Sequence, residues 1–218
     1  MAEINLLKNY PVTKRNLDER IDVKTEEVCF VARQFGKDFF DGDRKYGYGG
    51  YSYHPRFWQP VVPDFQKHYD LSGSSSILDV GCGKGFMLYD FVQAIPGIKV
   101  EGIDISSYAI QNAKEEVKSF LKVANATSLP YEDNSFDLVV SINTVHNLDL
   151  EECQKAICEI HRVSKKNCFI TVDAYRTSEE KKRMDAWNLT AKTYMSVDEW
   201  KEFFKQAGYQ GDYFWFIP

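Results

Sequence analysis

Two spacings of hydrophobic residues alternate along the chain from residue 76 onward. Between the strands that we predict, apolar side chains recur at helical spacing, as at Leu88, Phe91 and Ile95. The run at 136–142 is mostly apolar, which is typical of a strand buried on both faces of a parallel sheet. Short apolar runs predict strands at residues 76–80, 99–103, 121–124, 136–142, 168–172 and 212–216.

Polar residues mark the starts of the helices between these strands. Ser106 can cap a helix that continues to Phe120 with that ring facing inward, and Asp149 can cap the helix after residue 142. A polar helix is expected at 178–192, and residues 196–199 read as a capping box for the last helix. This order of elements predicts an α/β fold, a doubly wound and mostly parallel sheet with helices on both faces.

The first seventy residues have a different pattern. Two helices are predicted at 13–23 and 25–34, and residues 39–58 are dense in glycine and aromatic residues without clear periodicity. This stretch is either a loop that packs its rings onto the domain or an ordered lid that lines a pocket. We therefore expect residues 1–70 to form an N-terminal helical and aromatic lid segment of the same domain, and residues 71–218 to form its core.

Composition excludes several classes of protein. Hydrophobic residues make up 44% and charged residues 27% of the 218, which is ordinary for a globular protein, and the net charge of -5 argues against a dedicated nucleic-acid binder. No apolar run is long enough to span a membrane. Five cysteines without a CxxC pair indicate reduced thiols, so we expect a cytoplasmic protein without a metal site. We also expect a monomer or a homodimer.

A glycine-rich turn follows the first predicted strand. Its glycines at 81, 83 and 85 allow a sharp bend and let a ligand approach the bare backbone. Asp104 closes the next strand and can accept hydrogen bonds from two ribose hydroxyls, and dinucleotide-binding enzymes share this combination. However, a dinucleotide fingerprint needs its third glycine where this chain has Phe86. Asp79, two residues before the first glycine, can instead approach a cationic amino group.

Two further polar segments follow later strands. The amide of Asn125 and the backbone of Ala126 can meet the edge of an adenine, and residues 141–147 form a polar mouth past the central strand. In open α/β sheets, ligands bind outside the carboxyl ends of the strands. All of these features are therefore expected to meet at one binding site.

Four ordered motifs carry a resemblance to a known family. Leu78-Asp79-Val80-Gly81-Cys82-Gly83-Lys84-Gly85, Gly102-Ile103-Asp104-Ile105-Ser106, residues 125–130 and residues 134–141 resemble class I S-adenosylmethionine-dependent methyltransferases, most closely the ubiquinone/menaquinone-type branch. The resemblance covers about residues 76–172 and implies a Rossmann-like sheet with S-adenosylmethionine across the strand ends. It implies that the cofactor contacts Asp79, Gly81, Cys82, Gly83, Gly85, Asp104, Ile105, Asn125, Ala126 and Asn143. Many relatives have aspartate in place of Asn125 and His-His in place of His146-Asn147, so the acceptor side cannot be transferred.

The residues that would bind or deprotonate the methyl acceptor each have an alternative interpretation. His146 is the candidate general base, because imidazole titrates near neutral pH; the alternative is a loop histidine bonded to the backbone. Arg44, Arg56 and Arg176 either bind a phosphate or carboxylate or form surface salt bridges. The candidate acceptor-binding residues are Tyr46, Tyr48, Tyr51, Tyr53, Arg56, Trp58, Tyr175 and Arg176.

The sequence thus predicts an S-adenosylmethionine-dependent methyltransferase acting on a small molecule, with an anionic metabolite or a sugar derivative as the suggested acceptor. A nicotinamide-dependent oxidoreductase is the second hypothesis. A non-catalytic protein that binds S-adenosylmethionine or another protein is the third.

Overall fold

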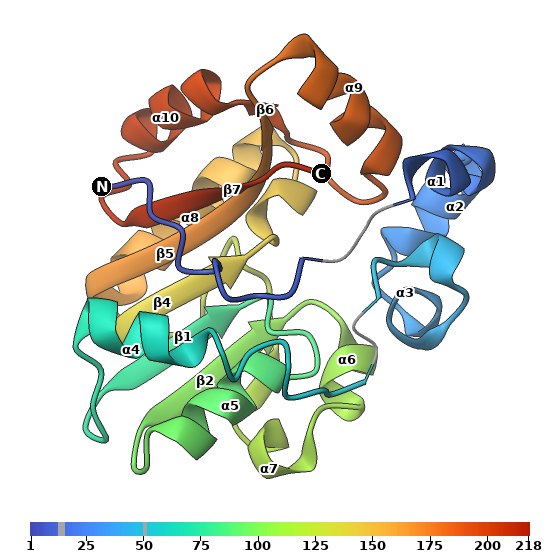
Figure 1. Ribbon diagram of the computed structural model, residues 1–218. Helices are drawn as coiled ribbons and strands as arrows, with labels where there is room; N and C mark the ends of the chain where they lie inside the picture. The colour runs from blue at the N-terminus through green and yellow to red at the C-terminus, as the bar shows by residue number, and fades with distance from the viewer. Residues whose placement is uncertain (13–15, 50–51) are drawn as a thin grey trace.

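The computed structural model describes residues 1–12, 16–49 and 52–218, and in this part of the chain a seven-stranded sheet forms the centre of the molecule (Figure 1). The strands are β1 (Ser76–Val80), β2 (Lys99–Asp104), β3 (Leu121–Val123), β4 (Phe136–Ile142), β5 (Ser164–Tyr175), β6 (Met195–Ser196) and β7 (Asp212–Phe216). Their order is β3-β2-β1-β4-β5-β6, with β7 also paired to β5, and every pairing between these strands is parallel. The predicted α/β, mostly parallel sheet is confirmed.

Helices connect the strands and cover both faces of the sheet (Figure 1). The α-helices are α1 (Leu17–Val23), α2 (Glu26–Ala32), α3 (Lys37–Asp41), α4 (Val62–Tyr69), α5 (Phe86–Ala94), α6 (Ser107–Gln111), α7 (Glu115–Lys118), α8 (Leu150–Val163), α9 (Ser178–Trp187) and α10 (Val197–Gln206). Two 3-10 turns, η1 (Arg44–Tyr46) and η2 (Val145–Asn147), lie in the aromatic stretch and after β4. In Figure 1, α1–α3 form a small cluster beside the sheet, near α6 and α9.

Alternate residues of each central strand pack into different hydrophobic cores. Ile77 and Phe169 join α4 and α5 on one face, whereas Leu78 and Ile170 join α8 and α10 on the other. Because both faces of the sheet are covered, polar groups of the central strands are accessible mainly at the strand ends. All strands run parallel, so their carboxyl ends meet at one edge, and the glycine turn, Asp104 and η2 lie there.

The N-terminal residues cover the free edge of β7. The Ile4 amide donates to the Tyr213 carbonyl at 2.9 Å, and the Tyr213 amide donates to the Ala2 carbonyl at 3.0 Å. Leu6 is buried in the core that contains Phe65. An edge strand with unpaired backbone groups invites pairing with other chains, so this cover protects the sheet.

Two predicted helices differ from those observed. The helix expected from Ser106 to Phe120 is divided into α6 and α7, and Phe120 is 46% exposed rather than inward. The division follows from a tertiary hydrogen bond, because the Lys114 amide donates to the Lys84 carbonyl at 2.9 Å instead of continuing the helix. The polar helix expected at 178–192 ends at Trp187. No helix in the described ranges is long and apolar enough to cross a membrane.

Candidate active site

The glycine turn between β1 and α5 has a backbone conformation that residues with a side chain rarely adopt. Gly81, Gly83 and Gly85 have φ angles of 89°, 53° and 75°, in the left-handed region. A Cβ on Gly81 would lie 2.1 Å from the Thr144 hydroxyl oxygen, so this glycine lets the loop after β4 approach the turn. The amides of residues 81 and 82 both donate to the Ile103 carbonyl, at 2.8 and 3.0 Å. The turn is therefore fixed against the ends of two strands.

Asp104, the last residue of β2, holds the turn from the other side. Its carboxylate accepts the Gly83 amide and the Ser106 amide, each at 2.8 Å, and the residue is buried. Ser106 also caps α6 by accepting the Ala109 amide at 3.0 Å. These bonds orient the carboxylate beside the glycine turn.

Asp79 is a second buried carboxylate at the same place, only 4% exposed. Burial, and secondarily the Asp104 carboxylate, raise the pKa of Asp79 to about 8. Among the described residues, no hydrogen bond or ion pair satisfies the Asp79 carboxyl group. Two buried acids without a cation form a site that would favour a positively charged group of a ligand.

The remaining predicted cofactor residues surround the turn in different environments. Cys82 is buried against Gly102, and burial raises the pKa of its thiol. Ile105 is 57% exposed. Asn125 is exposed, and its carboxamide oxygen accepts the amide and the hydroxyl of Thr127, both at 2.9 Å. Ala126 is partly buried next to it.

Asn143, just after β4, is the predicted cofactor residue that also lines a cavity. Its φ of 51° is held by Thr171 on β5, which accepts its amide at 3.0 Å and donates to its side-chain oxygen at 2.9 Å. Left-handed backbone in a non-glycine residue is strained and is frequent at functional sites. Asn143 thus lines the cavity, and the next residue, Thr144, contacts the glycine turn at Gly81.

The cavity has a volume of about 720 Å³ and opens between α1, the aromatic stretch and the ends of β4, β5 and β7. Asn143, His146, Asn147 and Asp173 supply polar groups from the strand ends. The cations in its lining are Arg20, Arg44, Lys45 and Arg56, and its aromatic residues are Tyr10, Phe39, Tyr48, Phe57, Trp187 and Phe216. An opening of this size suits a small molecule.

The cations come from the N-terminal segment. Arg20 is buried, donates to the carbonyls of Lys45 and Gly47 at 3.1 and 2.9 Å, and lies 4.9 Å from the Trp187 ring. Arg44 donates to the Gly47 carbonyl. Neither Arg44 nor Arg56 forms an ion pair with a described carboxylate. These two guanidinium groups are therefore available for an anion.

His146 in η2 is buried, and its backbone carbonyl accepts the amides of residues 192 and 193 at 3.0 Å each. Its Nδ1 accepts the Asp173 amide at 3.0 Å, so the proton of the neutral ring is on Nε2, 3.6 Å from the Asp173 carboxylate. Burial lowers the pKa of His146 to about 3. In this arrangement the ring is a hydrogen-bond donor, which does not fit the predicted general base; the alternative of a histidine bonded to the backbone describes it.

The candidate acceptor residues divide into two groups. Tyr48 and Arg56 line the cavity. The Tyr48 hydroxyl accepts the amides of Leu189 and Thr190 at 2.7 and 3.2 Å, and burial, then the Asp173 carboxylate, raise its pKa to about 12. Tyr48 thus contributes a ring to the cavity, and its hydroxyl binds the segment that follows α9.

Three other aromatic candidates do not line the cavity. Tyr46 packs on the small core of α2, and Trp58 packs on the core of α4 and α5. Tyr53 donates to Asp90 at 2.7 Å and packs against Tyr89. Each ring packs within the domain, so the structure does not bring these three predicted residues to the cavity. The predicted residue Tyr51 lies outside the described residues.

Tyr175 and Arg176, at and just after the end of β5, also lie away from the cavity. Arg176 pairs with Glu3 at 3.2 Å, and Tyr175 packs beside Lys181 of α9. The N-terminal residues and α9 take both side chains to the outer surface. Neither residue lines the cavity.

Two residues of the cavity could not be identified as site residues from the sequence pattern. Arg20 is one charged residue in a polar helix, and Trp187 ends a helix without a clear apolar face. Their contact joins α1 to α9, which are far apart in the chain. Only a three-dimensional arrangement identifies them.

Known proteins share this sequence pattern and fold. A tRNA (carboxymethyluridine(34)-5-O)-methyltransferase of Arabidopsis thaliana is 34% identical over 134 residues, which are 60% of this chain and 31% of that protein. A demethylmenaquinone methyltransferase of Symbiobacterium thermophilum is 29% identical over 162 residues, 70% of this chain and 62% of that protein. The chain thus spans less than two thirds of these curated relatives.

Solved structures support the fold. A phosphoethanolamine N-methyltransferase of Haemonchus contortus, in complex with phosphomonomethylethanolamine and S-adenosylhomocysteine, matches with a TM-score of 0.60. The match covers 81% of this chain and 44% of that one at 20% identity, so it shows the fold alone.

One protein family matches the greater part of the chain. Its description is "methyltransferase domain", and it matches residues 71–208, which include the glycine turn, Asp104, η2 and β5. The class I methyltransferase resemblance of the four motifs is confirmed by this match. The chain belongs to the methyltransferase domain family and has its Rossmann-like fold.

Proposed function

We propose that this protein is an S-adenosylmethionine-dependent methyltransferase with a small anionic acceptor. The observation that carries the proposal is the pair of buried acids, Asp79 and Asp104, at a turn of three left-handed glycines. A methyl donor with an ammonium group, a sulfonium and a ribose matches those acids better than an uncharged ligand does.

The residues at the strand ends fit S-adenosylmethionine. Asp79 would take the ammonium group, and Asp104 the ribose hydroxyls. Asn125, Ala126 and the exposed Ile105 would contact the adenine, and Asn143 would face the methionyl end. When bound, S-adenosylmethionine supplies an electrophilic methyl group on sulfur. The solved structure from Haemonchus contortus, which has the same fold, contains S-adenosylhomocysteine.

Asp173 and His146 would serve the acceptor at the cavity floor. The Asp173 backbone is fixed, because its carbonyl accepts the Trp200 indole at 2.9 Å and its amide donates to His146. Its buried carboxylate lines the cavity and is the proton acceptor in this proposal. The His146 Nε2–H would orient the acceptor by donating a hydrogen bond.

Charge argues for an anionic acceptor. Arg44 and Arg56 line the cavity without a described carboxylate partner, and guanidinium groups bind carboxylates and phosphates bidentately. The named relatives differ in acceptor, tRNA in one and demethylmenaquinone in the other, so neither name transfers. The net charge of -5 favours a small molecule over RNA.

Thermal denaturation with separate ligands tests the cofactor. S-adenosylmethionine and S-adenosylhomocysteine should raise the melting temperature, because they bind only the folded state, and NAD should not. Phe86 occupies the place of the third glycine of a dinucleotide turn, which argues against NAD. Stabilisation by NAD alone would support the oxidoreductase hypothesis instead.

A further inference from the structure

An ion pair between a buried lysine and a partly exposed aspartate joins the glycine turn to the N-terminal segment. Lys84 stands between two glycines of the turn, and its Nζ lies 2.6 Å from each carboxylate oxygen of Asp41. The Lys84 side chain is only 8% exposed. Tyr108 of α6 donates to the same carboxylate at 2.8 Å. Asp41 therefore links α3, the glycine turn and α6.

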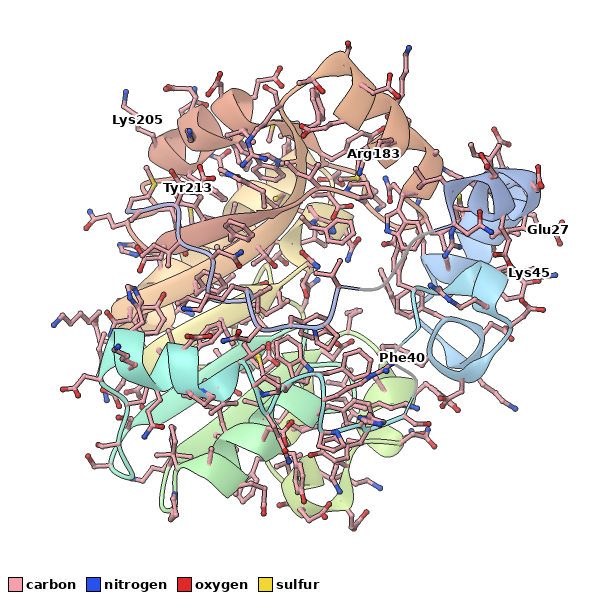
Figure 2. All side chains as sticks on the ribbon, in the orientation of Figure 1. Glu27, Phe40, Lys45, Arg183, Lys205 and Tyr213 are labelled. Atoms are coloured by element: carbon pink, nitrogen blue, oxygen red, sulfur yellow. The ribbon has the colours of Figure 1, made fainter. Side chains whose placement is uncertain are left out.

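Two more contacts join the same parts of the molecule. The Ser106 hydroxyl donates to the Phe35 carbonyl at 2.5 Å. Phe40 of α3, labelled in Figure 2, reaches the turn, since a Cβ on Gly83 would lie 3.4 Å from its ring. Ser106 and Gly83 are also the residues whose amides bind the Asp104 carboxylate. The N-terminal contacts thus fall on the two segments that hold Asp104.

The chain that makes these contacts continues directly into the cavity wall. We call residues 35–48 the bridging segment. Its first half touches the glycine turn, and its second half includes Lys45, labelled in Figure 2, and Tyr48. The cavity-lining members of this segment are Phe39, Asp43, Arg44, Lys45 and Tyr48.

The far end of the bridging segment is tied to the C-terminal half of the protein. Arg20 holds the carbonyls of Lys45 and Gly47, and the Tyr48 ring lies 5.8 Å from the Trp187 ring. A displacement of α3 by the glycine turn would therefore move groups around Trp187. Packed side chains and hydrogen bonds can carry such coupling between two sites, and the bridging segment provides a contiguous set of them.

We propose that Asp41 is a positioning residue that, through Lys84 and the bridging segment, couples occupancy of the glycine turn to the shape of the acceptor cavity. The proposal rests on the proposed function, because it assigns the methyl donor to that turn. Coupling between two sites is reciprocal, so donor binding raises acceptor affinity and acceptor binding raises donor affinity. Asp41 would thereby favour simultaneous occupancy of the two sites.

Fluorine NMR of the protein labelled with 5-fluorotryptophan tests this coupling without a known acceptor. S-adenosylhomocysteine is the probe, and the Trp187 resonance, assigned with Trp187→Phe, reports the cavity. In the wild type, the probe should shift that resonance. In Asp41→Asn the shift should be lost, and the dissociation constant of the probe should rise at least about fivefold, the lower range of allosteric coupling.

Controls separate the proposal from misfolding and from failure of the proposed function. Asp38→Asn makes the same chemical change at an exposed position of α3 and should behave as wild type. Unchanged Trp200 and Trp215 resonances, from the core of β5, β7 and α10, show that a variant is folded. Tyr108→Phe, which removes one hydrogen bond to Asp41, should give a smaller loss and serves if Asp41→Asn does not fold.

The outcomes are distinct. Failure of the probe to bind the wild type contradicts the proposed function. Binding without a Trp187 shift in the wild type overturns the coupling, and so does a full shift in Asp41→Asn. If Asp41→Asn does not fold, an unaltered response in Tyr108→Phe overturns it.

Discussion

At the scale of single residues, burial sets the charge of the two central ionisable groups. Asp79 and His146 lie at the same edge of the sheet and are both almost inaccessible to water. Burial disfavours the charged form, so it raises the pKa of the acid and lowers that of the imidazole. The two groups therefore affect the pH dependence of folding in opposite directions.

For Asp79 we predict stability that falls as pH rises. Its pKa is about 8 in the folded protein against 3.8 in the unfolded chain, so the folded state binds more protons between these values. Asp79→Asn removes this titration and should increase the free energy of unfolding at pH 8 by at least about 1.4 kcal/mol, the equivalent of one pKa unit. Urea denaturation at pH 5 and pH 8 measures it.

The same substitution should weaken S-adenosylhomocysteine binding, because the amide cannot pair with an ammonium group. Asp198→Asn, on the exposed start of α10, is the matched control. Equal stability of Asp79→Asn and wild type at pH 8 would show that Asp79 is ionised there without cost.

For His146 we predict a neutral ring with its proton on Nε2. The unfolded pKa is 6.5 and the folded pKa about 3, so the unfolded chain binds more protons between them. The contribution of His146 to stability is therefore lost as pH falls below about 6.5. Nitrogen-15 NMR of the imidazole should show no titration from pH 5 to 8; a step near pH 6.5 would restore the general-base hypothesis.

At the scale of elements, the glycine turn depends on its neighbours in space. The left-handed φ of Gly81 is only part of its requirement, because Thr144 occupies the place of a side chain. Gly208, at the end of α10, has a φ of 68° but open space around its Cα. A substitution at Gly208 therefore measures backbone strain alone, whereas one at Gly81 measures backbone strain together with a steric clash.

We predict unequal costs for alanine at these positions. Gly208→Ala should lower the free energy of unfolding by about 1–2 kcal/mol, the cost of the left-handed region. Gly81→Ala adds the clash with Thr144 and should cost at least about 1 kcal/mol more. Urea denaturation compares them. Similar losses would mean that the loop after β4 moves away freely.

The elements with local signals were predictable from the sequence. The predicted starts of β1, β2, β4 and β7 agree with the structure, because apolar runs bounded by polar residues specify them. The Ser196–Glu199 capping box is also present. The break between α6 and α7 was not predictable, because the Lys114 amide is diverted by the Lys84 carbonyl, thirty residues earlier in the chain.

The candidate site was predictable only on its cofactor side. Asp79, the glycines and Asp104 lie within two consecutive strand ends, so their spacing in sequence reflects their spacing in the fold. The acceptor cavity joins Arg20, Tyr48, Asp173 and Trp187, whose proximity depends on tertiary packing. An aromatic-rich sequence therefore indicated the correct region but not which rings face the cavity.

At the scale of the whole molecule, the charges at the cavity differ from the net charge of the chain. The chain carries a net charge of -5, whereas the cavity lining has four cations and three carboxylates, those of Glu19, Asp43 and Asp173. The two buried acids, Asp79 and Asp104, lie at the glycine turn and are not among the residues that line the cavity. This separation suits a cationic donor on one side and an anionic acceptor on the other.

Transfer of a labelled methyl group tests the central claim most directly. The protein, S-adenosylmethionine carrying the label, and a metabolite extract or tRNA are incubated in parallel, with Asp173→Asn and Asp198→Asn as variants. We predict label in low-mass anionic metabolites with wild type and Asp198→Asn, and at least about a hundredfold less with Asp173→Asn, the scale of general-base catalysis. Label in tRNA alone, no transfer at all, or equal transfer by Asp173→Asn would contradict the account.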